Sequence, residues 1–198
     1  MTSAPIKGTA TTAAGLTAKD RAENVMITDL VRNDLHRVCD PGTVEVTGLL
    51  QVEEHPGLVH LVSTVQGRLA PDVAAADDLW ARVLAATYPP GSVSGAPKSA
   101  ALRVIAELEP VPRGPYCGVV GWIDADAGRA ELAVGIRTFW WTADAPETSA
   151  GRSRSATSSG TLRFGTGAGI TWGSDPEAEW AETELKARRL IALASAPD

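Results

Sequence analysis

Two pairs of acidic residues have a spacing that could place their carboxylates side by side. Asp20 and Glu23 form one pair, and Glu179 and Glu182 form the other. Residues three positions apart share one face of a helix. If the two faces converge, they offer the hard oxygen ligands that Mg²⁺ prefers, with water and an anionic substrate completing its shell. The other interpretation is a solvated helix surface, where this spacing is common.

Glycines and an arginine indicate places where an anion could bind. Gly167 and Gly169 lie between an apolar stretch and a helix start, where glycine lets backbone N–H groups approach an anion. A tight turn explains the same two residues. Arg137 lies in an otherwise apolar segment, and a guanidinium there needs an anionic partner. That partner is either a structural acid or a substrate carboxylate.

The remaining candidates are a histidine, two lysines and two cysteines. His60 lies in an apolar stretch, either as a core histidine with satisfied hydrogen bonds or as a catalytic group. Lys7 and Lys98 are expected to be solvated. Cys39 and Cys117 are far apart in sequence, and we expect reduced core residues rather than a disulfide.

Hydrophobic periodicity predicts the elements that carry these residues. The first helix has Val25, Met26, Ile27 and Leu35 on its expected apolar face, and a capping residue at Ser174 starts the last helix. Helices are predicted at 19–38, 77–87, 98–108 and 174–194, and strands at 43–50, 57–69, 116–123, 129–142 and 162–172. Residues 143–160 lack an apolar pattern, which predicts a mobile loop. Antiparallel strand pairs with separate helices indicate an α+β domain.

Composition excludes several classes of protein. The chain has 198 residues and a mass of 20.6 kDa, with 44% hydrophobic residues and a formal charge of −6. An acidic balance does not fit a generally basic nucleic-acid binder. No apolar run approaches the roughly 20 residues of a membrane span, and the first residues lack the apolar region of a secretory signal. We therefore expect a cytoplasmic protein with no nucleic-acid or membrane partner.

A series of motifs follows one order along nearly the whole chain. The motifs are Pro5-Ile-Lys-Gly-Thr9, Lys19-Asp-Arg-Ala-Glu-Asn24, Asp29-Leu-Val-Arg-Asn-Asp34, His60-Leu-Val-Ser63, Gly91-Ser-Val-Ser-Gly-Ala-Pro-Lys98, Tyr116-Cys-Gly118, Gly135-Ile-Arg-Thr138, Gly167-Ala-Gly169 and Ser174-Asp-Pro-Glu-Ala-Glu179. With them the chain resembles the C-terminal part of the chorismate-binding enzymes, which include anthranilate synthase component I, aminodeoxychorismate synthase component I, isochorismate synthase and salicylate synthase.

The resemblance implies a fold and a set of site residues. The family fold is an α+β sandwich of two antiparallel sheets with flanking helices, so residues 1–198 would be the C-terminal portion of one chorismate-binding domain, without its N-terminal strands. The active site would bind chorismate with Mg²⁺. The implied metal residues are Glu23 and Glu182, with Asp20 and Glu179 nearby through water. The implied substrate-binding residues are Tyr116, Arg137, Gly167, Gly169 and Ser94. The implied catalytic residues are Lys7 and His60, with His60 beside the ring.

Lys7 implies a branch of the family, because aminodeoxychorismate synthases have lysine where anthranilate synthases typically have alanine. By that analogy Lys7 is a nucleophile that adds at C2 of chorismate while the C4 hydroxyl leaves. Ammonia then adds at C4 and expels the lysine, which gives 4-amino-4-deoxychorismate. A free lysine amine is almost wholly protonated at neutral pH, so the pocket must desolvate it or place it near another cation.

The resemblance has three departures from the family pattern. Ser94 stands where many relatives of this branch have threonine, and the stretch from Lys7 to Lys19 is short. The family also has upstream strands and an upstream glutamate that acts as general acid, which have no counterpart in this sequence. These departures imply weak activity by the chain alone and a tendency to self-associate.

The leading hypothesis is an aminodeoxychorismate synthase component I-like protein of folate or para-aminobenzoate biosynthesis, with ammonia supplied by a glutamine amidotransferase. The alternatives are an anthranilate or isochorismate synthase-type enzyme, and a truncated chorismate-binding fragment without catalysis. Lys7 argues against anthranilate formation.

Overall fold

The computed structural model describes residues 1–143 and 160–195. They belong to two compact units, Met1–Leu108 and Glu109–Asp198, named below the N-terminal and C-terminal units. The mobile loop predicted at 143–160 lies outside the described residues except for its two ends. No helix in the described part of the chain is long and apolar enough to cross a membrane.

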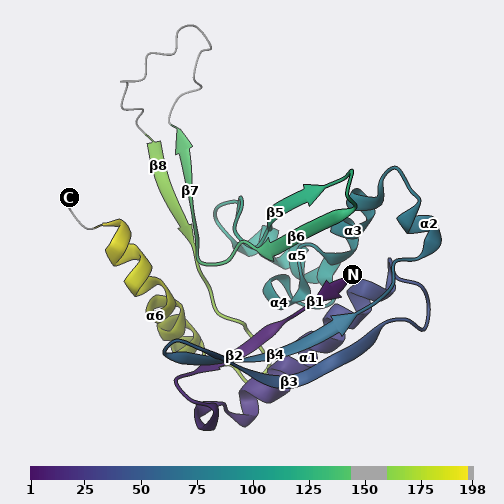
Figure 1. The fold of residues 1–198 in the computed structure, drawn as a ribbon. Helices are drawn as coiled ribbons and strands as arrows, with labels where there is room; N and C mark the ends of the chain where they lie inside the picture. The colour runs from purple at the N-terminus through teal and green to yellow at the C-terminus, as the bar shows by residue number, and fades with distance from the viewer. Residues whose placement is uncertain (144–159, 196–198) are drawn as a thin grey trace, which may run out of the picture. The chain divides into compact units, whose positions relative to one another are not determined.

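An antiparallel sheet of four strands organises the N-terminal unit (Figure 1). β4 (Leu58–Gln66) pairs along one edge with β3 (Glu45–His55) and along the other with β1 (Thr2–Ser3) and then β2 (Ile6–Ala10). β4 is the strand with neighbours on both edges, and most of its Val and Leu side chains are buried. The two strands predicted at 43–50 and 57–69 are thus confirmed, although β3 continues to His55.

Helix α1 (Ala18–His36) packs against β2, β3 and β4. Its start is fixed by a reciprocal cap, in which Thr17 Oγ1 accepts a hydrogen bond from the Asp20 backbone N–H at 3.1 Å. The Asp20 carboxylate in turn accepts one from the Thr17 N–H at 2.8 Å. Such a capping box satisfies backbone donors that a helix start otherwise leaves unpaired.

The buried side of α1 differs from the predicted one. Val25 and Met26, expected to face the core, are 46% and 47% exposed. The buried residues of the helix are Asn24, Ile27, Thr28, Asp34 and Leu35. Polar side chains can take these positions because each has a hydrogen-bond partner inside the unit. Apolar periodicity therefore predicted Ile27 and Leu35 correctly, but it placed Val25 and Met26 on the wrong face.

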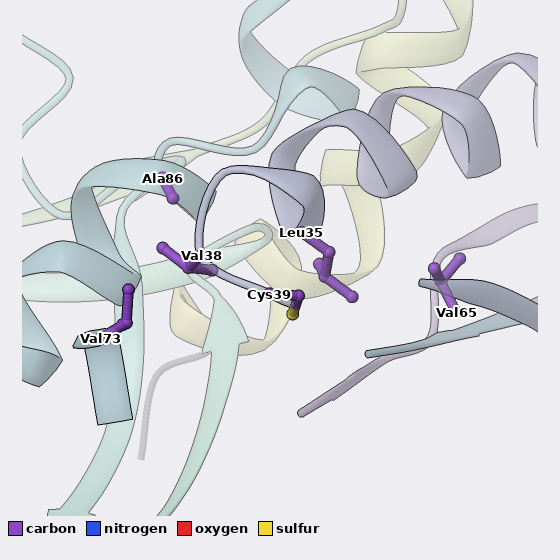
Figure 2. Close-up of a cluster of buried hydrophobic side chains, with 6 residues drawn as sticks. All are labelled: Leu35, Val38, Cys39, Val65, Val73 and Ala86. Atoms are coloured by element: carbon purple, nitrogen blue, oxygen red, sulfur yellow. The ribbon is translucent and has the colours of Figure 1, made fainter. Parts of the chain in front are cut away.

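Six buried side chains form the larger core cluster of the N-terminal unit. Figure 2 shows them: Leu35, Val38, Cys39, Val65, Val73 and Ala86. They come from the end of α1 and the residues after it, from β4, from α2 (Pro71–Ala74) and from α3 (Leu79–Thr87). Both cysteines of the chain are free and buried, as predicted.

The N-terminal unit ends in two further helices. α4 (Gly91–Ser94) is a single turn inside a segment that the sequence predicted as loop. α5 (Lys98–Leu108) confirms the helix predicted there and has no buried residue.

The C-terminal unit contains two separate antiparallel strand pairs and a long helix. β5 (Val119–Asp124) pairs with β6 (Arg129–Val134), and β7 (Thr138–Ala143) pairs with β8 (Gly160–Gly165). α6 (Pro176–Ala194) follows. The single strand predicted at 129–142 is wrong, because the chain leaves the first pair after Val134. The strand predicted at 162–172 is too long, because β8 ends at Gly165.

The structure confirms the α+β class. Every strand pairing is antiparallel in the described residues, and the long helices are separate from the strand pairs. That residues 1–198 form part of a single larger domain stays a prediction.

Candidate active site

Lys7 and Glu23 form an ion pair in the N-terminal unit. Lys7 lies in β2 and Glu23 in the second turn of α1, and Lys7 Nζ is 3.7 Å from Glu23 Oε2. Their side chains are 24% and 22% exposed, so the pair is partly shielded from water yet open to a ligand. Lys19 approaches the same carboxylate from its own helix, with Nζ 3.7 Å from Oε1. Two cations therefore lie beside Glu23.

A close approach between β2 and α1 brings this pair together. Gly8 has a φ of +93°, and a Cβ at this position would lie 2.9 Å from Asp20 Cβ. Glycine adopts this conformation at low cost and leaves room for the helix. A larger residue would separate β2 from α1, and with them Lys7 from Glu23.

Asp20 has a structural role in this site. Its Oδ2 accepts hydrogen bonds from the Thr17 N–H at 2.8 Å and from the Thr17 hydroxyl at 2.6 Å. The carboxylate is therefore part of the helix cap. Its expected place near a metal ion, through water, stays a prediction.

His60 lies on β4, opposite Glu53 of β3 and Thr9 of β2. It is half-buried, and its ring centroid is 4.8 Å from that of His55. The side chain is thus neither a fully enclosed core histidine nor a fully solvated one.

Ser94 and Lys98 hold the segment after α3 in place. The Ser94 hydroxyl donates to the Pro90 carbonyl at 2.9 Å. Lys98 Nζ donates to both carboxylate oxygens of Asp34 and to the Ala86 carbonyl, each at 3.1 Å. The expectation that Lys98 is solvated is therefore wrong. Its partner is 64 residues away in sequence, which local spacing could not reveal.

In the C-terminal unit, Tyr116 packs against the backbone after β8. A Cβ on Gly165 would overlap the tyrosine ring, and one on Gly167 would lie 2.7 Å from the Tyr116 hydroxyl oxygen. Burial, reinforced by the neighbouring Cys117 thiol, raises the pKa of Tyr116 to about 12. The phenol therefore stays protonated near neutral pH and can donate a hydrogen bond.

Arg113 lies over the ring of Tyr116. Its guanidinium carbon is 5.5 Å from the centroid of the Tyr116 ring, a distance at which a cation attracts the π face. Glu109 orients the guanidinium through hydrogen bonds of 2.6–3.1 Å from Nε and Nη2. These bonds raise the pKa of Arg113 and lower the pKa of Glu109. A hollow of about 300 Å³ is lined by Glu109, Val111, Pro112, Arg113, Tyr116, Trp140, Arg163 and Phe164.

Arg137 lies between β6 and β7, at a φ of +50°, and not within a strand as predicted. Two backbone hydrogen bonds of 2.9 Å join its segment to the one that carries Tyr116. In one, the Cys117 N–H donates to the Gly135 carbonyl, and in the other the Gly135 N–H donates to the Gly118 carbonyl. The structure therefore brings the backbones that carry Tyr116 and Arg137 together.

Gly167 and Gly169 belong to the irregular segment between β8 and α6. Asp175 is the capping residue of α6, because its side chain accepts from the Ala178 N–H at 2.9 Å. The prediction that Ser174 caps this helix is wrong. The Ser174 hydroxyl instead donates to Glu179 at 2.7 Å. One turn further along α6, Glu182 Oε1 forms an ion pair with Lys186 Nζ at 2.7 Å.

The predicted site residues thus fall into two sets. Lys7, Asp20, Glu23, His60 and Ser94 lie in the N-terminal unit, and Tyr116, Arg137, Gly167, Gly169, Glu179 and Glu182 lie in the C-terminal unit. Within either unit taken alone, the described residues include no group of three or more His, Cys, Asp or Glu placed to hold a metal ion. A site on Glu23 and Glu182 stays a prediction.

Sequence reasoning missed the buried polar residues that surround Lys7 and Glu23. Asn24, Thr28 and Ser63 are 0%, 3% and 0% exposed, and they bond to one another across α1 and β4. The signal was available, because Ser63 interrupts an apolar strand and Asn24 and Thr28 are one helical turn apart.

Comparison with known proteins gives a consistent result. The family model described as chorismate binding enzyme matches residues 1–192. The chain is 44% identical to anthranilate synthase component 1 of Saccharolobus solfataricus over 87% of its own length and 36% of that protein. It is 41% identical to an aminodeoxychorismate synthase of Streptomyces pristinaespiralis, over 96% of the chain and 25% of that protein.

A solved structure agrees with these relatives. The menaquinone-specific isochorismate synthase of Escherichia coli matches 97% of the chain with a TM-score of 0.72 and 26% identity. The chain spans 41% of that structure and about a third or less of the two curated relatives.

Proposed function

The chain belongs to the chorismate-binding enzymes, and from this premise we propose that it carries the lysine nucleophile and most substrate-binding residues of an aminodeoxychorismate synthase component I-like enzyme. Its reaction would join ammonia to chorismate with Mg²⁺ and give 4-amino-4-deoxychorismate. The pathway would be folate or para-aminobenzoate biosynthesis in the cytoplasm.

The ion pair between Lys7 and Glu23 is the observation that carries this proposal. Lys7 is a lysine on a strand whose side chain is three-quarters buried and lies 3.7 Å from a carboxylate. The ion pair also leaves hydrogen-bonding capacity on the ammonium group, which has three donors. Family resemblance assigns a lysine in this motif to amination at C4 rather than to anthranilate formation.

The reaction has two substitution steps on this lysine. The Lys7 ammonium first releases one proton to solvent. Its free amine then forms a bond to C2 of chorismate while the C4–O bond breaks, and the hydroxyl group leaves with an amine proton as water. Ammonia then forms the C4–N bond, and the C2–N bond to Lys7 breaks and releases the free lysine. The released amine takes a proton back from solvent and returns Lys7 to its starting state, so the lysine is catalytic.

The remaining residues would hold the substrate, which is a dianion. The protonated phenol of Tyr116 and the guanidinium of Arg137 would hold one carboxylate, helped by N–H groups near Gly167 and Gly169. Ser94 would contribute to the wall of the pocket, and His60 would lie beside the ring.

Glu23 and Glu182 are partly exposed carboxylates, and their hard oxygen donors fit Mg²⁺. When bound, Mg²⁺ would supply positive charge next to the substrate carboxylates. To coordinate it, Glu23 would have to exchange its lysine partners and Glu182 would have to exchange Lys186. Ammonia would come from a separate glutamine amidotransferase.

A second candidate is an anthranilate synthase-type reaction. The observation in its favour is the 44% identity to an anthranilate synthase component 1, which is slightly higher than the 41% and 42% identity to two aminodeoxychorismate synthases. Lys7 favours the first candidate. A chorismate-binding fragment without catalysis is the remaining alternative.

Product analysis tests the proposal. The purified chain is incubated with chorismate, Mg²⁺ and ammonium, and products are separated by liquid chromatography and identified by mass. Thermal shift with chorismate and Mg²⁺ is recorded in parallel. We expect stabilisation by chorismate and a slow release of 4-amino-4-deoxychorismate. Anthranilate or isochorismate as the product would overturn the assignment, and stabilisation without any product would identify a binding fragment.

A further inference from the structure

A fully buried side-chain amide connects three segments that carry proposed site residues. Asn24 Nδ2 donates to the Leu61 carbonyl at 2.9 Å and to the Lys7 carbonyl at 3.4 Å. Asn24 directly follows Glu23 in α1, and Leu61 directly follows His60 in β4. One amide group therefore holds the backbone of the lysine strand and the backbone of the histidine strand against the helix turn of Glu23.

The orientation of this amide is fixed by a serine. The Ser63 hydroxyl donates to Asn24 Oδ1 at 2.5 Å and accepts from the Leu50 N–H at 3.0 Å. The Ser63 hydroxyl has one proton and donates it to Oδ1, which identifies Oδ1 as the acceptor. Both protons of Asn24 Nδ2 are then available for the carbonyls of Lys7 and Leu61. The reversed orientation would place Oδ1 against two carbonyl oxygens, which repel it.

The same serine reaches an irregular place in β3. Leu50 has a φ of +54°, and the pairing of β3 with β4 shifts register between Gly48 and Gln51. A non-glycine residue in this conformation is strained, and Ser63 satisfies its N–H. The hydrogen-bond chain thus runs from the β3 irregularity through Ser63 and Asn24 to Lys7.

We propose that Asn24 and Ser63 are positioning residues, which hold Lys7 at its distance from Glu23. The expected effect on the reaction rate rests on the proposed function, but the expected change in the distance between Lys7 and Glu23 does not depend on any reaction. Buried polar atoms that lose a partner shift to find another. The Lys7 backbone would therefore move when the amide is removed. A displacement of about 1 Å at a reacting group can cost on the order of 10²-fold in rate.

Three single variants test the proposal. Asn24→Ala removes the amide, and Ser63→Ala removes only its orienting hydroxyl, so this milder variant serves if the first fails to fold. Thr28→Val is the matched control, because Thr28 is similarly buried in the same helix and its hydroxyl bonds to the Asn24 backbone carbonyl at 2.7 Å. The same hydroxyl also lies 3.3 Å from Asn24 Oδ1, but its single proton goes to the nearer carbonyl, and Ser63 remains the closer partner of Oδ1. Both contacts of Thr28 lie within α1 and do not reach β2 or β4.

Carbodiimide crosslinking measures the geometry directly. The reagent joins an amine to a carboxylate only at contact distance, and mass spectrometry quantifies each product. The crosslink between Lys19 and Glu23 is the internal reference, since both residues lie in α1. We expect the ratio of the Lys7–Glu23 crosslink to the Lys19–Glu23 crosslink to fall in Asn24→Ala and Ser63→Ala and to stay constant in Thr28→Val, at temperatures where circular dichroism shows each variant folded. A constant ratio in all three variants would overturn the proposal.

Kinetics supply the second measurement. If wild type forms 4-amino-4-deoxychorismate, we expect kcat to fall on the order of 10–10²-fold in Asn24→Ala with KM nearly constant, because a misplaced nucleophile affects the reacting step and not binding. Equal losses of kcat in Thr28→Val would indicate a general loss of stability and contradict the proposal. If wild type forms no such product while the crosslink ratio falls, the proposed function fails and the positioning role stands.

Discussion

Two lysine–carboxylate pairs in the N-terminal unit differ in how many donors the lysine uses. Lys98 directs three hydrogen bonds to Asp34 and Ala86, which matches the three donors of an ammonium group. Lys7 meets Glu23 at 3.7 Å, a distance that allows ionic attraction without a hydrogen bond. All three donors of Lys98 are therefore used in structural hydrogen bonds, whereas the ammonium group of Lys7 has donors left for a further partner.

This difference predicts opposite outcomes for two substitutions. Lys7→Ala should lower aminodeoxychorismate formation by orders of magnitude and leave chorismate affinity and thermal stability nearly unchanged. Lys98→Met leaves Asp34 without its partner, so we expect a loss of about 1–3 kcal/mol in the free energy of unfolding. Denaturant unfolding and product formation are measured on both variants. Full turnover by Lys7→Ala would show that another group is the nucleophile.

Tyr116 predicts a pH effect at high pH. Its folded-state pKa of about 12 is above the ordinary value of 10.0, so the folded chain keeps the phenol proton at pH values where the unfolded chain loses it. The free energy of unfolding should therefore decrease as pH rises from about 10 to about 12. Absorbance titration of tyrosinate in wild type and Tyr116→Phe gives the pKa, and a Tyr116 midpoint near 10 would contradict the burial of the phenol.

At the scale of elements, α6 presents its acidic residues on different faces. Glu179 and Glu182 lie three positions apart and share a face, whereas Glu177 lies on another face of the helix. If a metal ion binds Glu182, Glu182→Gln should strongly weaken Mg²⁺-dependent binding of chorismate, and Glu177→Gln should have little effect. Isothermal titration with and without Mg²⁺ makes the comparison, and equal effects would defeat the metal assignment.

The start of α1 offers an independent test of the fold. Thr17→Ala removes the hydroxyl that caps the Asp20 N–H and should lower the free energy of unfolding by about 1 kcal/mol, within a usual range of roughly 0.5–2 kcal/mol. Thr17→Ser keeps the hydroxyl and should therefore retain most of the stability that Thr17→Ala loses. Urea unfolding of wild type and the two variants measures the difference. An unchanged midpoint in Thr17→Ala would show that the cap does not contribute to stability.

For the whole molecule, the sequence predicted the fold class and the secondary-structure elements better than it predicted which distant residues contact one another. Strong patterns such as the apolar strand around Leu61 and the helix after Lys98 are local, and they were predicted correctly. The pairing of Lys98 with Asp34 and the bond of Asn24 to Leu61 join residues 64 and 37 positions apart, and no local pattern specifies them. Adjacent candidates also mislead, since Ser174 and Asp175 can both cap a helix and only geometry selects Asp175.

Exposed apolar side chains predict how the 198-residue chain behaves in solution. All six residues of β5 are exposed. Each sheet of the C-terminal unit has only two strands in the described residues, and a two-stranded sheet is marginally stable by itself in water. Further large apolar side chains are more than half exposed: Ile6, Leu49, Leu108, Trp141, Ile170, Trp172, Trp180, Leu185 and Leu193. Surfaces of this kind favour association, and open strand edges add a route to it.

We therefore expect the chain to sediment as oligomers at micromolar concentration and to bind a hydrophobic dye. Adding, as a separate polypeptide, the part of a longer relative that this chain does not match should cover apolar surface, because relatives of this family contain it in one protein. The expected result is a lower dye signal, a single complex by sedimentation velocity and a higher unfolding temperature. A monodisperse monomer without dye binding, unchanged by the added polypeptide, would contradict the argument and show that the exposed residues are solvated singly.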